Sequence, residues 1–369
     1  MAVPASSSSE TPRPLVGLSV ASLKALMSEW GQPAYRATQV YKWVHHHQVR
    51  DFQEMTNLSK ELRTRLADHF ILENLRLKTR QISSDGTRKY LWTIPSGHDI
   101  ESVFIPEEKR TTICISSQVG CALGCSFCAT ARMGFLQNLT TGEIVEQIIR
   151  VQQDTGVKIT NVVLMGMGEP FLNYPRVIDA CKIMSDPEGL AIAAKKVTIS
   201  TVGIVPRIRQ FSEEDQPFSL AISLHAPTQA LRQSIMPVAD KFSLEELMDS
   251  AREYTRITRK RITFEYVLLA GVNDNLRQAR ELLKLLSPLK CKLNLIPYND
   301  TGLGYDLPAQ ERQATFLEAL SRAPFTVTLR KNRGNDIAAA CGQLYAKSRE
   351  DEQPRFIAQP PDARAPQIL

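Results

Sequence analysis

The sequence predicts an α/β protein whose main part is a partial parallel barrel of six βα units, preceded by a small helical domain. Beyond residue 110, short β-branched runs alternate with helical patterns: residues 111–116 precede 142–153, and residues 161–166 precede 174–185. Strands separated by helices of this length pair in parallel through right-handed crossovers. Polar residues at the ends of successive strands favour one ligand site at that edge of the sheet. An open, doubly wound sheet is the alternative.

The same alternation continues to residue 330. Further strands are predicted at 197–201, 218–224, 262–269, 292–297 and 325–330, and further helices at 204–211, 243–256, 275–286 and 308–322. Ahead of this series, residues 76–105 read as a strand–turn–strand segment with Ser84-Asp85-Gly86 as the turn.

Helical spacing of apolar residues marks the N-terminal part. Leu18, Leu23, Leu26, Met27 and Trp30 fall on one stripe, and further helical stretches run through Val40, Trp43 and Val44 and through residues 58–66. We therefore expect a flexible tail at 1–13, a helical domain at 14–72, a β extension at 73–105, the α/β core at 106–345 and a second tail at 346–369.

Composition limits the class of protein without naming a function. The chain has 369 residues, of which 43% are hydrophobic and 23% charged, as in ordinary globular proteins. It contains no apolar run long enough for a membrane helix, and its first residues lack the features of a secretory signal, so we expect a cytoplasmic protein. The net charge of +6 is compatible with nucleic-acid binding but does not require it.

Three cysteines occur close together in a C-x3-C-x2-C loop. Cys121, Cys125 and Cys128 follow the first strand of the repeat, and Gly120 and Gly124 allow a tight backbone path there. Three thiolates can hold three corners of a 4Fe–4S cluster, which usually has four cysteine ligands. Since no fourth cysteine lies nearby downstream, one iron would remain open to another ligand.

Two other interpretations of this loop, structural zinc and inert thiols, fit the sequence less well. Structural zinc sites are usually closed by four ligands, and no His or Cys within a dozen residues after Cys128 completes such a set. Three inert buried thiols fit a polar, glycine-rich segment less well still. Cys181 and Cys291 lie outside any motif and are predicted to pack in the core.

The cysteine loop resembles the signature of the radical S-adenosylmethionine (SAM) superfamily, which has an aromatic residue, here Phe127, before the last cysteine. The flanking sequences narrow this further. TTICISSQVGCALGCSFCATARMGF, MGMGEPFLNY, ISLHAP, LIPYN and RGNDIAAACGQL together resemble the RlmN/Cfr family of radical SAM rRNA adenine methyltransferases. Two further segments, GQPAYRATQVYKW and MTNLSKELR, are similar to the N-terminal domain of RlmN-type members, which implies that the helical domain at 14–72 binds RNA. The resemblance covers roughly residues 15–345.

The resemblance implies a mechanism with three further residues. Cys341 would accept a methyl group from one SAM, and a radical made from a second SAM would activate that methyl group for addition to the base. Cys114 would release the product by forming a disulfide with Cys341, and Glu101 would accept the proton of the ring carbon. From sequence alone, core packing would be the more ordinary explanation of Cys114 and Cys341.

Further positions are implied for the cofactor. The open iron of the cluster would chelate SAM, while Gly168 and Glu169 would meet the SAM amino group, since a carboxylate pairs with an ammonium. The other implied contacts with SAM are Ser200, Ser223, Leu224, His225 and Asn299.

RNA is the implied substrate. The expected target is carbon 2 of an adenine in 23S rRNA, with a tRNA adenine as a second candidate; Cfr-type methylation of carbon 8 and a non-enzymatic, zinc-holding RNA-binding protein are the alternatives. Basic residues at 252–261 and 330–333 are candidate phosphate contacts. His45, His46 and His47 are not predicted to bind metal, because neighbours on a helix point in different directions. The resemblance also implies a monomer and an electron donor such as flavodoxin or ferredoxin.

Overall fold

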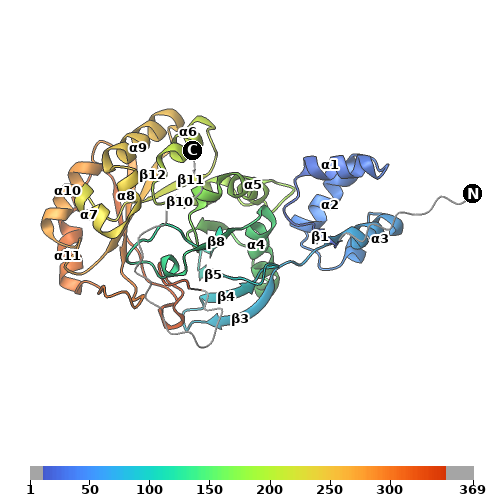
Figure 1. The fold of residues 1–369 in the computed structure, drawn as a ribbon, viewed down its shortest axis with the longest axis horizontal. Helices are drawn as coiled ribbons and strands as arrows, with labels where there is room; N and C mark the ends of the chain where they lie inside the picture. The colour runs from blue at the N-terminus through green and yellow to red at the C-terminus, as the bar shows by residue number, and fades with distance from the viewer. Residues whose placement is uncertain (1–10, 346–369) are drawn as a thin grey trace, which may run out of the picture.

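A ten-stranded mixed sheet forms the centre of the computed structural model, which describes residues 11–345 (Figure 1). Its strand order is β14-β13-β12-β11-β10-β9-β6-β5-β4-β3. The seven parallel strands are β6 (Arg110–Cys114), β9 (Asn161–Leu164), β10 (Val197–Thr201), β11 (Ser219–Ser223), β12 (Ile262–Leu268), β13 (Cys291–Pro297) and β14 (Thr326–Leu329). The predicted parallel series is thereby confirmed.

Helices connect each parallel strand to the next. They are α4 (Thr141–Thr155), α5 (Tyr174–Ser185), α6 (Val205–Glu213), α9 (Leu244–Thr258), α10 (Leu276–Leu286) and α11 (Gln310–Ala319). Local sequence sets several of their starts: Thr140 and Glu143 form a capping box before α4, and Ser243 and Glu246 form one before α9. With a helix in each of the six connections, the core contains the predicted six βα units and a seventh strand.

The parallel part of the sheet curves around a polar interior. Thr112 of β6 and Thr328 of β14 line the same cavity although five strands separate them in the sheet. This cavity, which we call the lumen, is also lined by Thr198, Thr263 and Asn294. The sheet is therefore a partial barrel rather than a flat, doubly wound one, and it is open between β14 and β3.

The β extension differs from the predicted hairpin in its extent. Three strands, β3 (Arg76–Ile82), β4 (Arg88–Thr93) and β5 (Asp99–Glu107), pair antiparallel in sequence order, and β5 pairs antiparallel with β6. The extension thus continues the core sheet instead of standing apart from it. Figure 1 shows β3 and β4 at its outer edge.

Several short elements were not predicted, and four of them lie close to the cysteine loop or between β11 and α9. α7 (Gln229–Ile235) and α8 (Val238–Lys241) lie between β11 and α9, while β7 (Gln118–Gly120) and β8 (Phe135–Asn138) form a two-stranded ribbon around the cysteine loop. Each is too short to produce a clear periodicity in the sequence.

The N-terminal part consists of α1 (Val20–Glu29), α2 (Tyr35–His45) and α3 (Lys60–His69), grouped on one side of the molecule next to α4 and α5 (Figure 1). β1 (Arg13–Pro14) pairs in parallel with β2 (Phe70–Ile71), so Arg13 is already paired although the predicted tail included it. The remainder of the predicted N-terminal tail, except residues 11 and 12, and the whole C-terminal tail lie outside the described residues.

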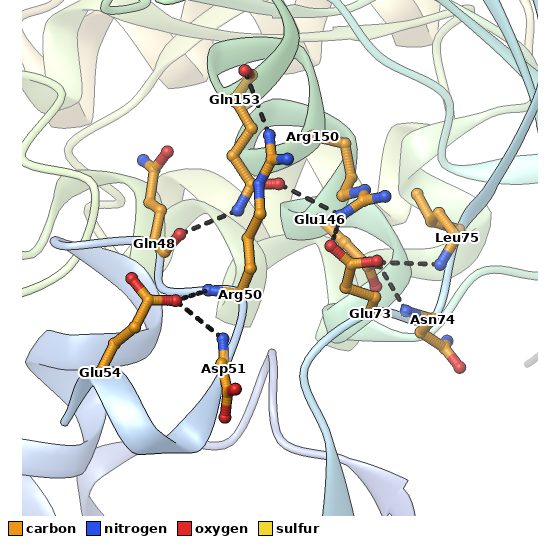
Figure 2. Close-up of polar contacts among 10 residues, drawn as sticks. All are labelled: Gln48, Arg50, Asp51, Glu54, Glu73, Asn74, Leu75, Glu146, Arg150 and Gln153. Carbon is orange, nitrogen blue, oxygen red and sulfur yellow. Dashed lines mark hydrogen bonds and ion pairs between the residues drawn. The ribbon is translucent and has the colours of Figure 1, made fainter.

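Polar contacts join the N-terminal helices to α4 (Figure 2). The Gln153 side chain donates to the Gln48 carbonyl at 2.8 Å, and Arg50 donates to the Gln153 carbonyl at 3.3 Å. In the chain that follows the helices, the backbone N–H groups of Asn74 and Leu75 donate to one oxygen of Glu146 at 2.7 and 2.8 Å. These bonds join α4 to the chain on both sides of α3. They therefore fix the position of the N-terminal helices on the core.

A close backbone approach completes this docking and can be tested. A Cβ atom added to Gly142 would lie 2.4 Å from the Val16 carbonyl oxygen, although Gly142 itself has no unusual φ. We expect Gly142→Ala to destabilise the protein by about 1–3 kcal/mol, the usual cost of overpacking. Urea unfolding would measure this loss, with Lys24→Ala on the exposed face of α1 as the control. Equal stability of the two variants would contradict the close docking.

None of the helices within residues 11–345 combines the length and apolarity needed to cross a bilayer.

Candidate active site

The cysteine loop lies within the ribbon formed by β7 and β8. Gly120 and Gly124 have φ values of +70° and +64°, and the Cys121 N–H donates to the Gly134 carbonyl at 2.8 Å. A side chain at position 120 would collide with that carbonyl, since its Cβ would lie 1.8 Å from the oxygen. The predicted need for glycine in a tight loop is confirmed here.

The three loop thiols share a poorly solvated environment. Burial raises the pKa of Cys121 to about 12 and also raises the pKa values of Cys125 and Cys128. The charge of Cys128 acts on both Cys121 and Cys125, so the three thiols lie close together. Thiolates in such a place require a compensating positive charge, which bound iron supplies because a coordinating thiol is deprotonated. The donor set therefore fits an iron–sulfur cluster.

A buried arginine lies beside these thiols. Arg232 of α7 is fully buried, its Nη2 donates to the Val202 carbonyl at 2.5 Å, and its Nε and Nη1 have no hydrogen-bond partner among the described residues. Burial lowers the pKa of Arg232 to about 10, whereas Cys125 raises it. An unpaired buried cation is costly, so Arg232 is suited to balancing negative charge on a cluster and its thiolates.

Within residues 11–345 no group of three or more His, Cys, Asp or Glu side chains is arranged to hold a metal ion. A cube does not need its thiolates to converge on one point, because each binds a different iron.

The segment that carries Cys341 packs directly on the cysteine loop. The Ala129 N–H donates to the Gly342 carbonyl at 2.8 Å, and the Thr130 hydroxyl donates to the Leu344 carbonyl at 2.7 Å. Residues more than 200 positions apart in the sequence are thereby held side by side, with Cys341 next to the loop of three cysteines.

Cys341 and Cys114 line one pocket, together with Met165, Asn299 and Arg330. Both thiols are free, Cys114 is buried at the end of β6, and burial followed by the charge of Cys341 raises its pKa to about 12. The Arg330 guanidinium donates to the Cys341 sulfur at 3.1 Å. A pocket with two thiols and an arginine can support thiolate chemistry. Cysteines that only pack in the core would need neither a pocket nor an arginine beside the sulfur.

Glu101 faces the same side of the sheet as Cys114. In the antiparallel β5–β6 register Val103 lies opposite Cys114, and side chains two residues apart on a strand share a face. One Glu101 oxygen accepts the Tyr345 N–H at 2.8 Å and the other lies 3.5 Å from the Lys89 ammonium. Burial raises the pKa of Glu101, while Lys89 and the Tyr345 N–H lower it.

Glu169 is held by the backbone after β9. Its two oxygens accept the N–H groups of Phe171 and Val202, each at 2.9 Å, and its side chain is almost fully buried. Burial raises its pKa to about 7, although the two N–H donors lower it. Its charge also acts on Cys121, so a ligand ammonium paired with Glu169 would lie close to the cysteine loop.

The remaining residues implied for SAM lie around the same end of the sheet. Ser200 of β10 and Ser223 of β11 share a strand face with Thr198 and Ser219, which line the lumen, and Gly168 precedes Glu169 with φ +95°. The His225 ring lies edge-on to Phe127 with centroids 5.0 Å apart, and its Nδ1 accepts the Val267 N–H at 3.0 Å. The motif at 223–225 therefore contacts the cysteine loop itself.

Leu224 is buried and its N–H donates to the Glu265 carbonyl at 3.0 Å, while its carbonyl accepts the Ala226 N–H. The Asn299 amide donates to the Cys341 carbonyl at 3.3 Å, and its Oδ1 is buried without a partner among the described residues. An amide oxygen of this kind is available to a ligand.

The two basic stretches have different surroundings. Arg252 pairs with Asp249 on the exposed face of α9, whereas Lys260 and Arg261 line the lumen. Arg330, Lys331 and Arg333 all line the thiol pocket. The first stretch is thus divided between a solvated helix face and the lumen, while the second lies as predicted beside Cys341.

The three adjacent histidines do not converge. His45 is buried, with Nδ1 at 3.1 Å from the Tyr41 carbonyl and Nε2 accepting the Gly17 N–H, while His46 and His47 are exposed. Cys181 and Cys291 are buried in α5 and β13, which confirms that they belong to the core.

Sequence reasoning missed three contributors to the site, namely Arg232, Lys89 and Glu265. Arg232 lies in a short helix that was not predicted, and its burial has no sequence signal. Lys89 acts on Glu101 through pairing of neighbouring strands. Glu265 alternates with apolar residues in β12, and this period-2 pattern was the available signal that it faces the lumen.

Comparison with known proteins agrees with this arrangement. Residues 14–72 match the model of the ribosomal RNA large subunit methyltransferase N-terminal domain, and residues 115–283 match that of the radical SAM superfamily. The chain is 44% identical to the dual-specificity RNA methyltransferase RlmN of Pelobacter propionicus, covering 92% of this chain and 98% of that protein. It is also 44% identical to the enzyme of the same name from Cereibacter sphaeroides strain ATCC 17025, covering 93% and 92%.

A solved structure extends the likeness to three dimensions. The radical SAM methyltransferase from Sphaerobacter thermophilus superposes with a TM-score of 0.87 at 42% identity, covering 91% of this chain and all of that one. Since the curated relatives are similar over nearly their whole length, the chain belongs to the RlmN family of radical SAM RNA methyltransferases.

Proposed function

We propose that this enzyme methylates carbon 2 of an adenine in 23S rRNA, and an adenine in tRNA, through a methyl group carried on Cys341. The observation that carries the proposal is the pocket shared by Cys341 and Cys114, with Glu101 on the same face of the sheet and the cysteine loop alongside. The curated relatives are named dual-specificity RNA methyltransferases, which supports an RNA substrate.

The proposed cofactors are a 4Fe–4S cluster on Cys121, Cys125 and Cys128, and SAM held by Glu169, Asn299 and the other residues implied above. When bound, they supply a carbon-centred radical that can remove hydrogen from an unreactive methyl group. The protein positions these groups: Glu169 is already oriented by two N–H donors, and Asn299 bridges the SAM side of the site to Cys341.

The chain's own residues then divide the work. The Cys341 sulfur gives up its proton and attacks the SAM methyl carbon, so a sulfur–carbon bond forms as the sulfonium bond breaks. Arg330 stabilises the thiolate in that step, because its guanidinium donates to the sulfur. After the activated methyl carbon has joined the base, Glu101 accepts the ring-carbon proton. The unpaired electron of the adduct would return to the proposed cluster. The Cys114 thiolate then attacks the Cys341 sulfur, so a disulfide bond forms as the sulfur–carbon bond to the base breaks, and that carbon takes up a proton to become the new methyl group of the RNA.

Carbon 2 is favoured over carbon 8 by the N-terminal helices. Residues 14–72 match a domain named for ribosomal RNA methyltransferases of the RlmN type, and this domain is docked firmly on α4 (Figure 2). We also propose an electron donor such as flavodoxin or ferredoxin, a monomeric chain and a cytoplasmic location.

Nucleoside mass spectrometry tests the proposal. After expression in a host that lacks its own enzyme, we expect 2-methyladenosine in rRNA and tRNA and an added methyl group on Cys341. Cys114→Ala is expected to keep the methylated Cys341 but to trap RNA covalently on the protein, whereas Cys291→Ala should behave as wild type. The appearance of 8-methyladenosine would favour the Cfr-type reaction, and an unmodified Cys341 in active enzyme would refute the two-step route.

A further inference from the structure

The lumen of the partial barrel is polar where the interior of a parallel barrel is ordinarily packed. Layers of branched apolar side chains usually fill such an interior. Here the inward positions of β10, β12, β13 and β14 are occupied by Thr198, Thr263, Asn294 and Thr328, and all of them line the lumen. A polar, open interior is suited to a polar ligand rather than to stabilising the core.

Four cations surround the lumen at the N-terminal ends of the strands, and we call them the basic mouth. Lys195 and Lys196 directly precede β10, Arg261 directly precedes β12, and Lys292 is the second residue of β13. All four line the lumen and are exposed, and none forms an ion pair with any residue in 11–345. Four unpaired cations at one opening favour an anionic ligand.

The far end of the lumen reaches the thiol pocket. Met165, Arg330, Lys331 and Arg333 line both cavities, so the two share a wall beside Cys341. A ligand that enters at the basic mouth therefore has a route through the lumen to the pocket of Cys341.

One oxygen of a buried carboxylate in the lumen lacks a hydrogen-bond donor within residues 11–345. Glu265 is almost fully buried, one of its oxygens accepts the Asn294 amide at 2.9 Å, and Oε2 has no partner among the described residues. A buried acceptor of this kind needs a hydrogen-bond donor, which a nucleobase amino group can supply.

We propose that the lumen is the path by which single-stranded RNA reaches Cys341, with its phosphates bound at the basic mouth. A duplex would have to present an unstacked nucleotide, because a base that is modified at a ring carbon must leave its stack. The inference rests on the proposed function only in taking RNA as the substrate, and it adds the route and the residues that bind the backbone.

Binding of a fluorescein-labelled single-stranded oligoadenylate to the full-length holoenzyme tests this path. The variant is Lys196→Gln with Lys292→Gln, and the matched control is Arg280→Gln with Lys284→Gln on the exposed face of α10. We expect the dissociation constant of the first variant to rise about tenfold or more, because two charged contacts are lost. The slope of log affinity against log salt should become shallower by about 1.4 for two phosphates on a single strand. The control should leave both unchanged.

Methylation of Cys341 by SAM alone is measured in the same preparations. It should be equal in wild type and both variants, since that step requires no RNA. An affinity and salt slope equal to the control would overturn the proposed path. A second result would also overturn it. If the cluster of the mouth variant is reduced more slowly by an acidic redox protein while the variant binds RNA as well as wild type, the basic mouth is a protein-docking surface. If wild type never methylates Cys341 but the mouth variant still loses RNA, the proposed mechanism fails and the RNA path stands.

Discussion

Replacing Cys125 by alanine is expected to abolish RNA methylation and to reduce iron from about four per chain to a small remainder. Each loop cysteine is proposed to hold a different iron, so the loss of one leaves a corner of the cube without its protein ligand. Arg232 would then lie beside an incomplete cluster, with two of its nitrogens still unpaired among the described residues. Because the proposed radical requires an intact cluster, the loss should be complete rather than partial.

Iron analysis and the visible spectrum of protein purified anaerobically measure this effect, alongside nucleoside analysis of the RNA. Cys181→Ala is the matched control, since Cys181 is fully buried in α5 and takes no part in the loop. It should retain iron, colour and activity. Two results would contradict the assignment of the loop: a Cys125→Ala protein that keeps about four irons per chain, or a wild-type protein that contains one zinc per chain in place of iron.

Periodicity was sufficient for the repeating part of the fold. The predicted helix at 174–185 matches α5, and the one at 275–286 begins one residue before α10. Both are long amphipathic stretches that local sequence specifies, and Asn275 and Gln278 add a capping box before α10. The joining of β3–β5 to the core sheet could not be predicted in this way. It depends on pairing between β5 and β6, which is a contact between separate segments and leaves no periodic signal.

Site residues that belong to a sequence motif could be predicted, whereas those brought to the site by tertiary packing could not. Cys341 and Glu169 were found because their neighbours in the sequence resemble a family. Their surroundings follow from tertiary contacts: Arg330 on the Cys341 sulfur and Lys89 near Glu101 come from other strands or their ends. The same holds for the turn before β4, where Ser83 donates to Asp336 at 2.6 Å and holds the segment that carries Cys341.

Glu101→Gln is expected to slow transfer of the methyl group to RNA by about 10²- to 10⁴-fold, the usual contribution of a general base. The amide cannot accept the ring-carbon proton, but it keeps the size of the side chain and can still accept the Tyr345 N–H. Methylation of Cys341 should be unaffected, so the variant should accumulate RNA joined covalently to the protein. Glu318→Gln on the exposed face of α11 is the control and should retain the wild-type rate.

The pH dependence of this step separates a base from a merely structural carboxylate. Only ionised Glu101 can accept a proton, so the rate should fall as pH falls through its pKa. Burial raises that pKa, which places the fall above the ordinary range of a glutamate, about 4.3 in model peptides. Lys89 lowers the pKa, so Lys89→Met should move the fall to still higher pH. Single-turnover rates with enzyme already methylated on Cys341 would show this shift, and an unmoved profile would remove Glu101 from the role of base.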